Sequence, residues 1–260
     1  MERRGVWVAL ALLVCAGPTA AAARAPDPSA LGSKLAGTDG KEALAAAAAL
    51  GDARTPAAEG VLLDALALGL PPEVAAAALD AVSRHASDRA LPVLLAYARN
   101  RNVSVRTHAL QALGALAGTP AADGALLAAL GDNEHAVRAA AARLLAWKKD
   151  ARAVPKLLAL LAAGDDVAGA PLAALASAEV AAQIVDLAGR APDAVVAHTL
   201  GELLRRRDLG PEALYTSVVR ALGAIPGDDA LAELQKVVDA PATPRAARRD
   251  AQAFVEERRP

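Results

Sequence analysis

The sequence predicts an all-α protein, an α-α superhelix of about seven helical hairpins. Three observations lead to this fold class. Alanine occupies more than a quarter of the 260 positions while aromatic residues make up only 2%, which favours helices over strands. Hydrophobic residues make up 55% of the chain, enough to exclude a disordered polymer. A pattern with a period near 32 residues also recurs along the chain.

The first residues have the features of an export signal. Arg3 and Arg4 precede the apolar run VWVALALLV at residues 6–14, which is far shorter than the roughly 20 residues needed to span a bilayer. Small residues at 20–23 suit cleavage by a signal peptidase. We therefore expect residues 1–23 to be removed and the mature protein to be periplasmic or secreted.

Cys15 leaves a second possibility open, because a lipid on this cysteine would anchor the chain to a membrane. The bulky Val14 before it fits a lipoprotein signal poorly. An uncleaved anchor is a third possibility, and the paired arginines also allow twin-arginine export. Removal of the signal leaves a mature chain without cysteine, which excludes disulfides and thiolate chemistry. Residues 24–40 are rich in Pro, Gly and Ser, and we expect a flexible linker there.

Residues 41–258 are predicted to form the superhelix. The clearest copies of the repeat read VSVRTHALQALGAL at 103–116 and HAVRAAAARLLAW at 135–147. Successive helices of this type are aligned by their first buried position, which falls at Glu42, Val74, Val105, Val137 and Val167. The register is disturbed around Val195 and is expected to resume at Leu214 and Ala246. This predicts an irregular repeat within residues 165–210.

Each copy is followed by a second helix, as in residues 88–98, 151–163 and 228–238. Turns rich in Pro, Gly and Asp separate the two helices. A single pair of short helices cannot bury its own apolar stripe. Successive pairs are therefore expected to stack on one another.

These features resemble those of HEAT-repeat proteins, most closely the short HEAT-like repeats of phycobilisome lyases. A Val-Arg pair recurs at 105–106 and 137–138, and a Pro recurs early in the other helix at 92 and 155. An acidic or amide residue precedes an Arg by six positions in Asn100/Arg106, Asp132/Arg138 and Asp239/Arg245. The resemblance implies a right-handed HEAT-like solenoid in which these six side chains form a ladder between repeats.

The resemblance also implies that the Val-Arg helices line the concave face, where such proteins bind their partners. An advance of about 100° per residue from Val105 gives the outward positions. The candidate contacts are His108, Gln111, Arg143, Trp147, Arg205 and Arg220. Trp147 is either a binding anchor or a filler against a neighbouring repeat. The arginines either face solvent or form a basic stripe for an acidic segment of a partner.

The sequence gives no indication of an enzyme. It lacks GxSxG, GxxxxGK and GxGxxG motifs, and its four histidines have no metal-binding spacing. We expect no catalytic, cofactor-binding or metal-binding residue. A net charge of −1 argues against nucleic acid as a ligand. The sequence is thus interpreted as a scaffold or adaptor for a protein or peptide. The alternative is an accessory or lyase-like subunit of a bilin-type enzyme system.

Overall fold

The computed structural model describes residues 27–116, 118–241 and 243–258, so the expected signal lies outside the described residues. The described chain contains fifteen α-helices, three 3-10 helices and no strand, which confirms the predicted fold class. The helices are α1 (Pro28–Leu35), α2 (Gly40–Ala53), α3 (Pro56–Leu68), α4 (Pro72–His85), η1 (Asp88–Ala90), α5 (Leu91–Tyr97), α6 (Val103–Ala115), α7 (Pro120–Ala129), α8 (His135–Trp147), η2 (Ala151–Ala153), α9 (Val154–Ala162), η3 (Asp166–Ala168), α10 (Gly169–Leu175), α11 (Ala178–Val185), α12 (Asp193–Arg205), α13 (Glu212–Ala224), α14 (Asp228–Asp239) and α15 (Arg245–Glu257).

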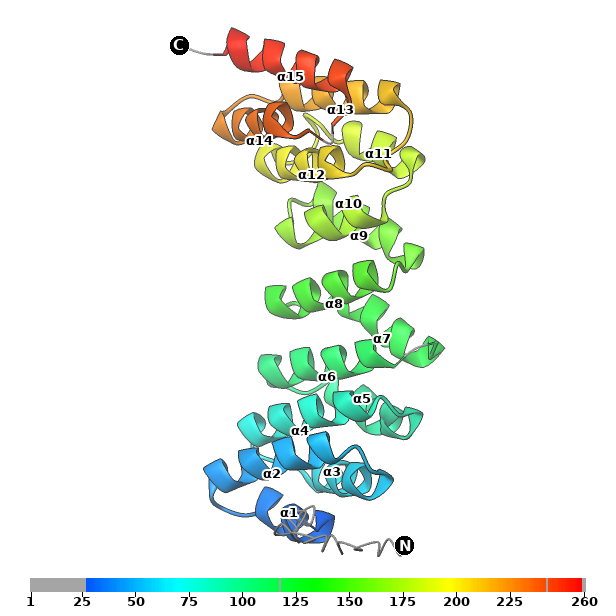
Figure 1. Cartoon of the computed structure of the whole chain (residues 1–260), viewed down its shortest axis with the longest axis vertical. Coiled ribbons are helices and arrows are strands. Elements are labelled where there is room, and N and C mark those ends of the chain that lie inside the picture. The colour runs from blue at the N-terminus through cyan, green and yellow to red at the C-terminus, as the bar shows by residue number, and fades with distance from the viewer. Residues whose placement is uncertain (1–26, 117, 242, 259–260) are drawn as a thin grey trace, which may run out of the picture.

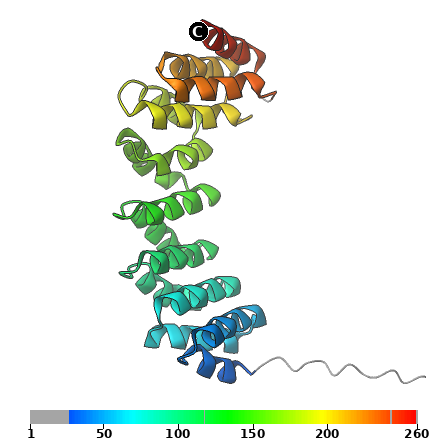
Figure 2. The ribbon, with the colours of Figure 1, turned by 90° about the vertical axis from the view of Figure 1, so that its left-hand side faces the viewer.

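The helices stack in two parallel rows along the long axis of the molecule (Figure 1). From α2 to α14, each even-numbered helix packs on the next even-numbered one, and we call these helices the even row. The odd-numbered helices form the second row, the odd row, with α15 packed on both α13 and α14. Figure 2 shows the even row facing the viewer. Because α1 precedes the first pair, α2–α15 make up seven helical hairpins, as the sequence predicts.

The residues expected to form a flexible linker contain α1 instead. Asp27 begins this helix by accepting a hydrogen bond from the main-chain N–H of Ser29. The helix buries Leu35 and packs on α2 and α3. It therefore covers the N-terminal end of the stack, which would otherwise expose the apolar sides of both helices.

The two rows alternate without interruption through the region expected to be irregular. The helices there are short, seven residues in α10 and eight in α11, but α12 still packs on α10 and α14 on α12. Leu214 and Ala246 consequently lie in α13 and α15, in the odd row. Their expected alignment with Val105 was wrong, because α12 occupies the even-row place and α13 follows half a repeat later.

The core between the rows consists almost entirely of Leu, Ala and Val. Small residues let consecutive helices approach closely, and glycine is used where a larger side chain lies against the backbone. At Gly114 in α6, an added Cβ would lie 2.7 Å from Leu144 Cδ2 of α8. Val105, Leu110 and Leu113 are fully buried, so the helical phase inferred for α6 is correct.

Leu113→Ala is expected to lower the free energy of unfolding by about 2–5 kcal/mol, because Leu113 is 0% exposed and its truncation leaves a cavity. Urea unfolding followed by circular dichroism measures the loss. The control is Ser104→Ala on the exposed side of the same helix, which should change stability by less than about 0.5 kcal/mol. Equal stability of the Leu113 variant and the wild type would contradict this packing.

Candidate functional site

Two arginines tie successive even-row helices together. The Arg106 guanidinium pairs with Asp132 at 3.0 Å, and that of Arg138 pairs with Asp165 at 2.7 Å. Each arginine also donates to the main-chain carbonyl six positions before it, Arg106 to Asn100 at 2.8 Å and Arg138 to Asp132 at 2.9 Å. The carboxylate partner thus belongs to the next repeat, while the residue six positions earlier contributes its carbonyl.

Asp165 extends this ladder and was not predicted as part of it. The signal was present in the spacing, since Asp165 follows Arg138 by 27 positions and Asp132 follows Arg106 by 26. The pair Asp239/Arg245 does not continue the ladder. Asp239 accepts hydrogen bonds from Gln235, and Arg245 has no hydrogen bond or ion pair within the described residues. The physical reason is position, because Arg245 lies on α15 in the odd row, whereas Arg106 and Arg138 lie on even-row helices.

Arg138→Gln is expected to lower the free energy of unfolding by about 1–3 kcal/mol, because it leaves the largely buried Asp165 carboxylate without its charged partner. Arg245→Gln removes an exposed arginine that makes no hydrogen bond or ion pair with any described residue, and it should have an effect below about 0.5 kcal/mol. Urea unfolding of both variants makes the comparison. Similar losses in the two would show that the ladder contributes nothing specific.

A second set of side chains satisfies the free carbonyls at the C-terminal ends of helices. Each reaches back to the previous helix of its own row. Lys148 donates to the carbonyl of Leu116 at 3.0 Å, and Arg206 donates to those of Ala173 and Ala176 at 2.8 and 2.5 Å. His85 bonds the Leu50 carbonyl in the same way at 3.1 Å. These three side chains therefore have structural roles.

Five of the six expected partner contacts lie on the even row and one does not. His108 and Gln111 are half-buried in α6, Arg143 and Trp147 are exposed in α8, and Arg205 ends α12. Trp147 is 74% exposed, so it does not fill a gap between repeats.

Arg220 lies in α13, in the odd row, 4.0 Å from Asp250. It does not share a face with the other five, because the alignment that selected it was half a repeat out of phase.

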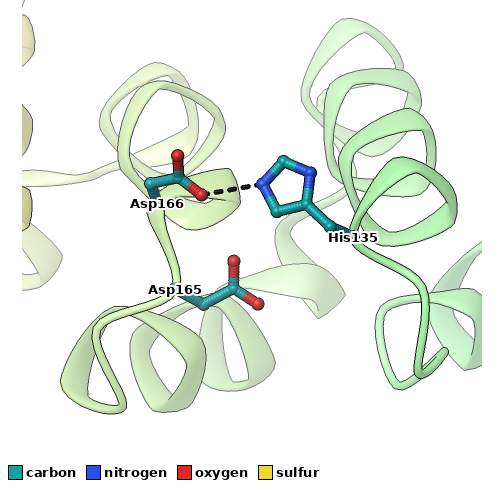
Figure 3. A group of neighbouring side chains, drawn as sticks. All are labelled: His135, Asp165 and Asp166. Atoms are coloured by element: carbon teal, nitrogen blue, oxygen red, sulfur yellow. Dashed lines mark hydrogen bonds and ion pairs between the residues drawn. The ribbon is translucent and has the colours of Figure 1, made fainter.

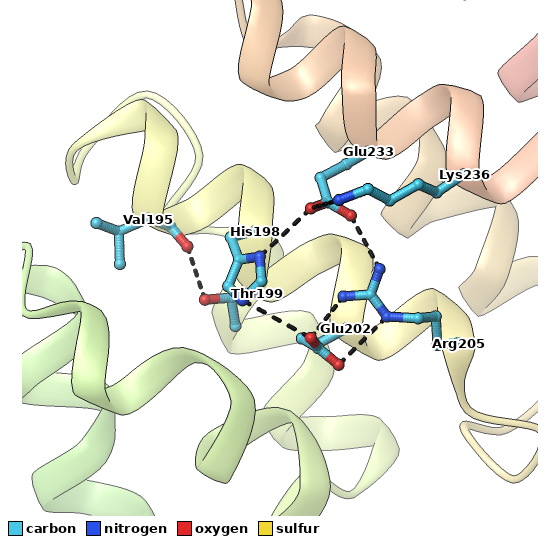
Figure 4. A network of polar contacts seen from close by, with 7 residues as sticks. All are labelled: Val195, His198, Thr199, Glu202, Arg205, Glu233 and Lys236. Atoms are coloured by element: carbon cyan, nitrogen blue, oxygen red, sulfur yellow. Dashed lines mark hydrogen bonds and ion pairs between the residues drawn. The ribbon is translucent and has the colours of Figure 1, made fainter. Parts of the chain in front are cut away.

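His108 and Arg205 are engaged in contacts between repeats. His108 Nδ1 lies 2.6 Å from Asp80 Oδ1 on the preceding even-row helix. Arg205 donates to Glu233 on the following one at 3.0 Å and also pairs with Glu202 (Figure 4). These two side chains are therefore less available to a partner than Arg143 and Trp147.

Glu233 is the centre of the network that joins α12 and α14. Its buried carboxylate accepts hydrogen bonds from Lys236 at 2.9 Å and from Arg205, and it lies 3.3 Å from His198 Nδ1 (Figure 4). Burial raises the pKa of Glu233, but the bonds from Lys236 and His198 and the charge of Arg205 outweigh it and lower that pKa. Gly201 makes room for this carboxylate against α12. The network is internally satisfied and structural.

His135, Asp165 and Asp166 are the described residues with potential metal-ligand spacing, since one ligand atom of each lies within 4.8 Å of the others (Figure 3). His135 Nε2 is 2.8 Å from Asp166 Oδ1, and this hydrogen bond lowers the pKa of Asp166. Asp165, however, holds Arg138 with one oxygen and the N–H of Val167 with the other. A metal ion would displace that arginine, so the group fits a contact between repeats better than a metal site.

A cleft of about 710 Å³ lies far from the expected contacts, at the N-terminal end of the stack. The α1–α2 and α3–α4 loops form it, and Leu68, which is 87% exposed, stands at its wall. None of the six expected partner contacts lines it.

A family model described as HEAT repeats matches residues 61–134 and 99–176. Residues 61–176 are HEAT repeats. The matched region contains the ladder residues from Asn100 to Asp165. No curated protein matches this chain. None of the described helices is long and apolar enough to cross a membrane.

Three solved structures that align along most of this chain have low sequence identity to it. The complex of CpcE and CpcF of phycocyanin lyase from Nostoc sp. PCC7120 is 18% identical, with 96% of this chain and 99% of that chain covered and a TM-score of 0.47. Human deoxyhypusine hydroxylase is 19% identical, covering 88% and 94%, with a TM-score of 0.40. A designed armadillo repeat protein in complex with the peptide (KR)4 is 18% identical, covering 89% and 99%, with a TM-score of 0.39.

Proposed function

We propose that this chain is an exported, non-catalytic scaffold that binds a protein or peptide on the even row, around Trp147. The observation that carries the proposal is the exposure of Trp147, at 74%, in a chain with two tryptophans and one phenylalanine. An exposed indole is unfavourable because it leaves apolar surface in contact with water. Tryptophan is also among the residues that dominate the binding energy at protein interfaces.

A non-catalytic role agrees with the use of the polar side chains. The four histidines, the usual general bases at neutral pH, each bond a group on a neighbouring repeat. The buried Glu233 pairs with Arg205 and Lys236 and lies 3.3 Å from His198 Nδ1. These residues hold repeats together, which leaves the exposed surface for recognition.

Affinity capture from a cell-envelope extract tests the surface. The mature chain should retain a protein that Trp147→Ala/Arg143→Glu loses, because the double variant removes the proposed anchor and inverts its neighbouring charge. Leu68→Ser/Lys34→Glu is the matched control, since it changes another large exposed apolar residue and a cation that has no ion pair among the described residues. The captured protein, once purified, must bind the wild type and the control directly. Retention of the same proteins by all three forms would contradict the proposed surface.

Export is tested separately by the mass of the released chain. Expression of the full chain in a bacterial host should place the protein in the periplasm or medium, with Arg24 as its first residue, because the small residues at 20–23 suit the peptidase. A chain that retains Met1 in the cytoplasmic fraction would contradict export. If the chain is instead found in the membrane fraction with a lipid on Cys15, it is exported as a lipoprotein rather than as a secreted protein.

A further inference from the structure

Helices α8, α10 and α12 follow one another in the even row, and Trp147 is the last residue of α8. Helix α10 packs on both α8 and α12. Arg206, at the end of α12, holds the last carbonyls of α10. The bond from Arg206 lowers the pKa of Asp208, and the charge of Lys149, just after α8, adds a smaller effect in the same direction. In the even row, only α10 lies between the loop after α8, which holds Lys149, and the loop after α12, which holds Arg207.

The carboxylates near these helix ends already have cationic partners. Asp123 pairs with Lys148 at 3.0 Å and with Arg152 at 3.2 Å. Asp150 also pairs with Arg152, at 2.6 Å, and Asp208 pairs with Arg206 at 3.0 Å. Farther along α12 and on α14, Arg205 pairs with both Glu202 and Glu233, and Lys236 also pairs with Glu233. These pairs leave no free negative charge of their own to oppose an incoming anion.

Three further cations lie in the same region. Arg143, Lys149 and Arg207 are exposed and make no hydrogen bond or ion pair with any described residue. Arg143 lies one turn before Trp147 on the same side of α8, and Lys149 follows Trp147 by two positions. The neighbouring α10 exposes only the short side chains of Ala170 and Ala174 on this side. A partner backbone can therefore approach Trp147 without steric obstruction.

We propose that Arg143, Trp147, Lys149 and Arg207, the tryptophan patch, bind an acidic segment of a partner protein that carries an apolar side chain. This inference rests on the proposed function and adds the chemistry of the partner. The apolar side chain packs on the exposed indole, and carboxylates on either side of it pair with the free cations. The two arginines offer planar forks that match a carboxylate, whereas Lys149 adds a point charge.

A peptide is favoured over other anionic ligands. Single-stranded nucleic acid is held by successive aromatic side chains along a basic groove, and the patch has one aromatic residue and three free cations. Adsorption to an anionic lipid surface takes a larger basic cluster than this, in a chain whose net charge is −1. The experiment that follows includes an oligonucleotide and anionic vesicles as separate probes, so binding of either ligand would be detected.

The mature chain provides its own probe, because removal of residues 1–23 takes away Trp7 and leaves Trp147 as the only tryptophan. The acetylated and amidated peptide Glu-Glu-Leu-Glu-Glu is titrated against this chain while indole emission is recorded. Emission should shift to shorter wavelength as the leucine covers the indole. The shift should be absent with Lys-Lys-Leu-Lys-Lys, and the affinity should fall as salt is raised.

Two triple variants with the same change in net charge make the comparison specific. Arg143→Glu/Lys149→Glu/Arg207→Glu should weaken binding of the acidic peptide by about tenfold or more. Lys34→Glu/Arg99→Glu/Arg245→Glu replaces exposed, unpaired cations elsewhere and should bind like the wild type. Circular dichroism confirms that both variants are folded. If the patch variant misfolds, the single substitution Arg207→Glu replaces it, with weaker binding still expected.

Absence of an emission shift with the acidic peptide would overturn the inference, as would equal weakening in both triple variants. A shift with a single-stranded oligonucleotide or with phosphatidylglycerol vesicles, but not with the peptide, would assign the patch to that ligand instead. The proposed function fails separately. If Trp147→Ala/Arg143→Glu loses a captured protein while the acidic peptide does not bind, the surface stands and the partner chemistry is wrong.

Discussion

The structure depends on the stacking of each even-row helix on the previous helix of that row. A single hairpin of these short helices, rich in alanine, buries too little apolar surface to be stable alone. Close approach between small side chains supplies part of the missing contact, as at Gly114 and Leu144. Polar side chains supply the rest, because Arg106 and Arg138 each reach a carboxylate on the following repeat.

The same constraint explains which polar groups are unavailable for function. Stacking leaves carbonyls unsatisfied at the helix ends, and Lys148, Arg206 and His85 are used to bond them. The remaining histidines and Glu233 bridge neighbouring repeats. A few exposed side chains of the even row, among them Trp147 and Arg143, do not bond another repeat within the described residues. Recognition of a partner is the use to which such a surface is best suited.

The sequence predicted those features that repeat with a clear local pattern. The all-α class, the number of hairpins and the buried phase of α6 followed from helix-forming composition and from the spacing of Val105 and Val137. The arginines of the ladder were identified, but the repeat that supplies each carboxylate was not, because the stacking of repeats brings together side chains that are 26 or 27 positions apart. Helix α1 was not predicted, because it is held in place by the burial of Leu35 against α2 and α3, and the local composition does not show these contacts.

The same limit explains the misplacement of Arg220. The sequence of α13 resembles that of an even-row helix, and only packing reveals that α12 already occupies that position. In the same way, Arg143 and Arg205 look alike in the sequence. The structure separates them, because Glu202 and Glu233 neutralise Arg205 whereas Arg143 has no partner within the described residues. Free and engaged cations are distinguished by tertiary contacts.

Cross-linking in the mature chain, which has no native cysteine, tests the uninterrupted alternation of the two rows most directly. Cysteines replace His198 and Lys236 in one variant, and His198 and Arg220 in another. They are treated with a bismaleimide whose length is close to one helix-to-helix distance, about 8–10 Å. The stacking of α14 on α12 predicts that one linker joins positions 198 and 236, while 198 and 220 each take a separate linker, as read from the mass. A single linker between 198 and 220, with none between 198 and 236, would contradict it.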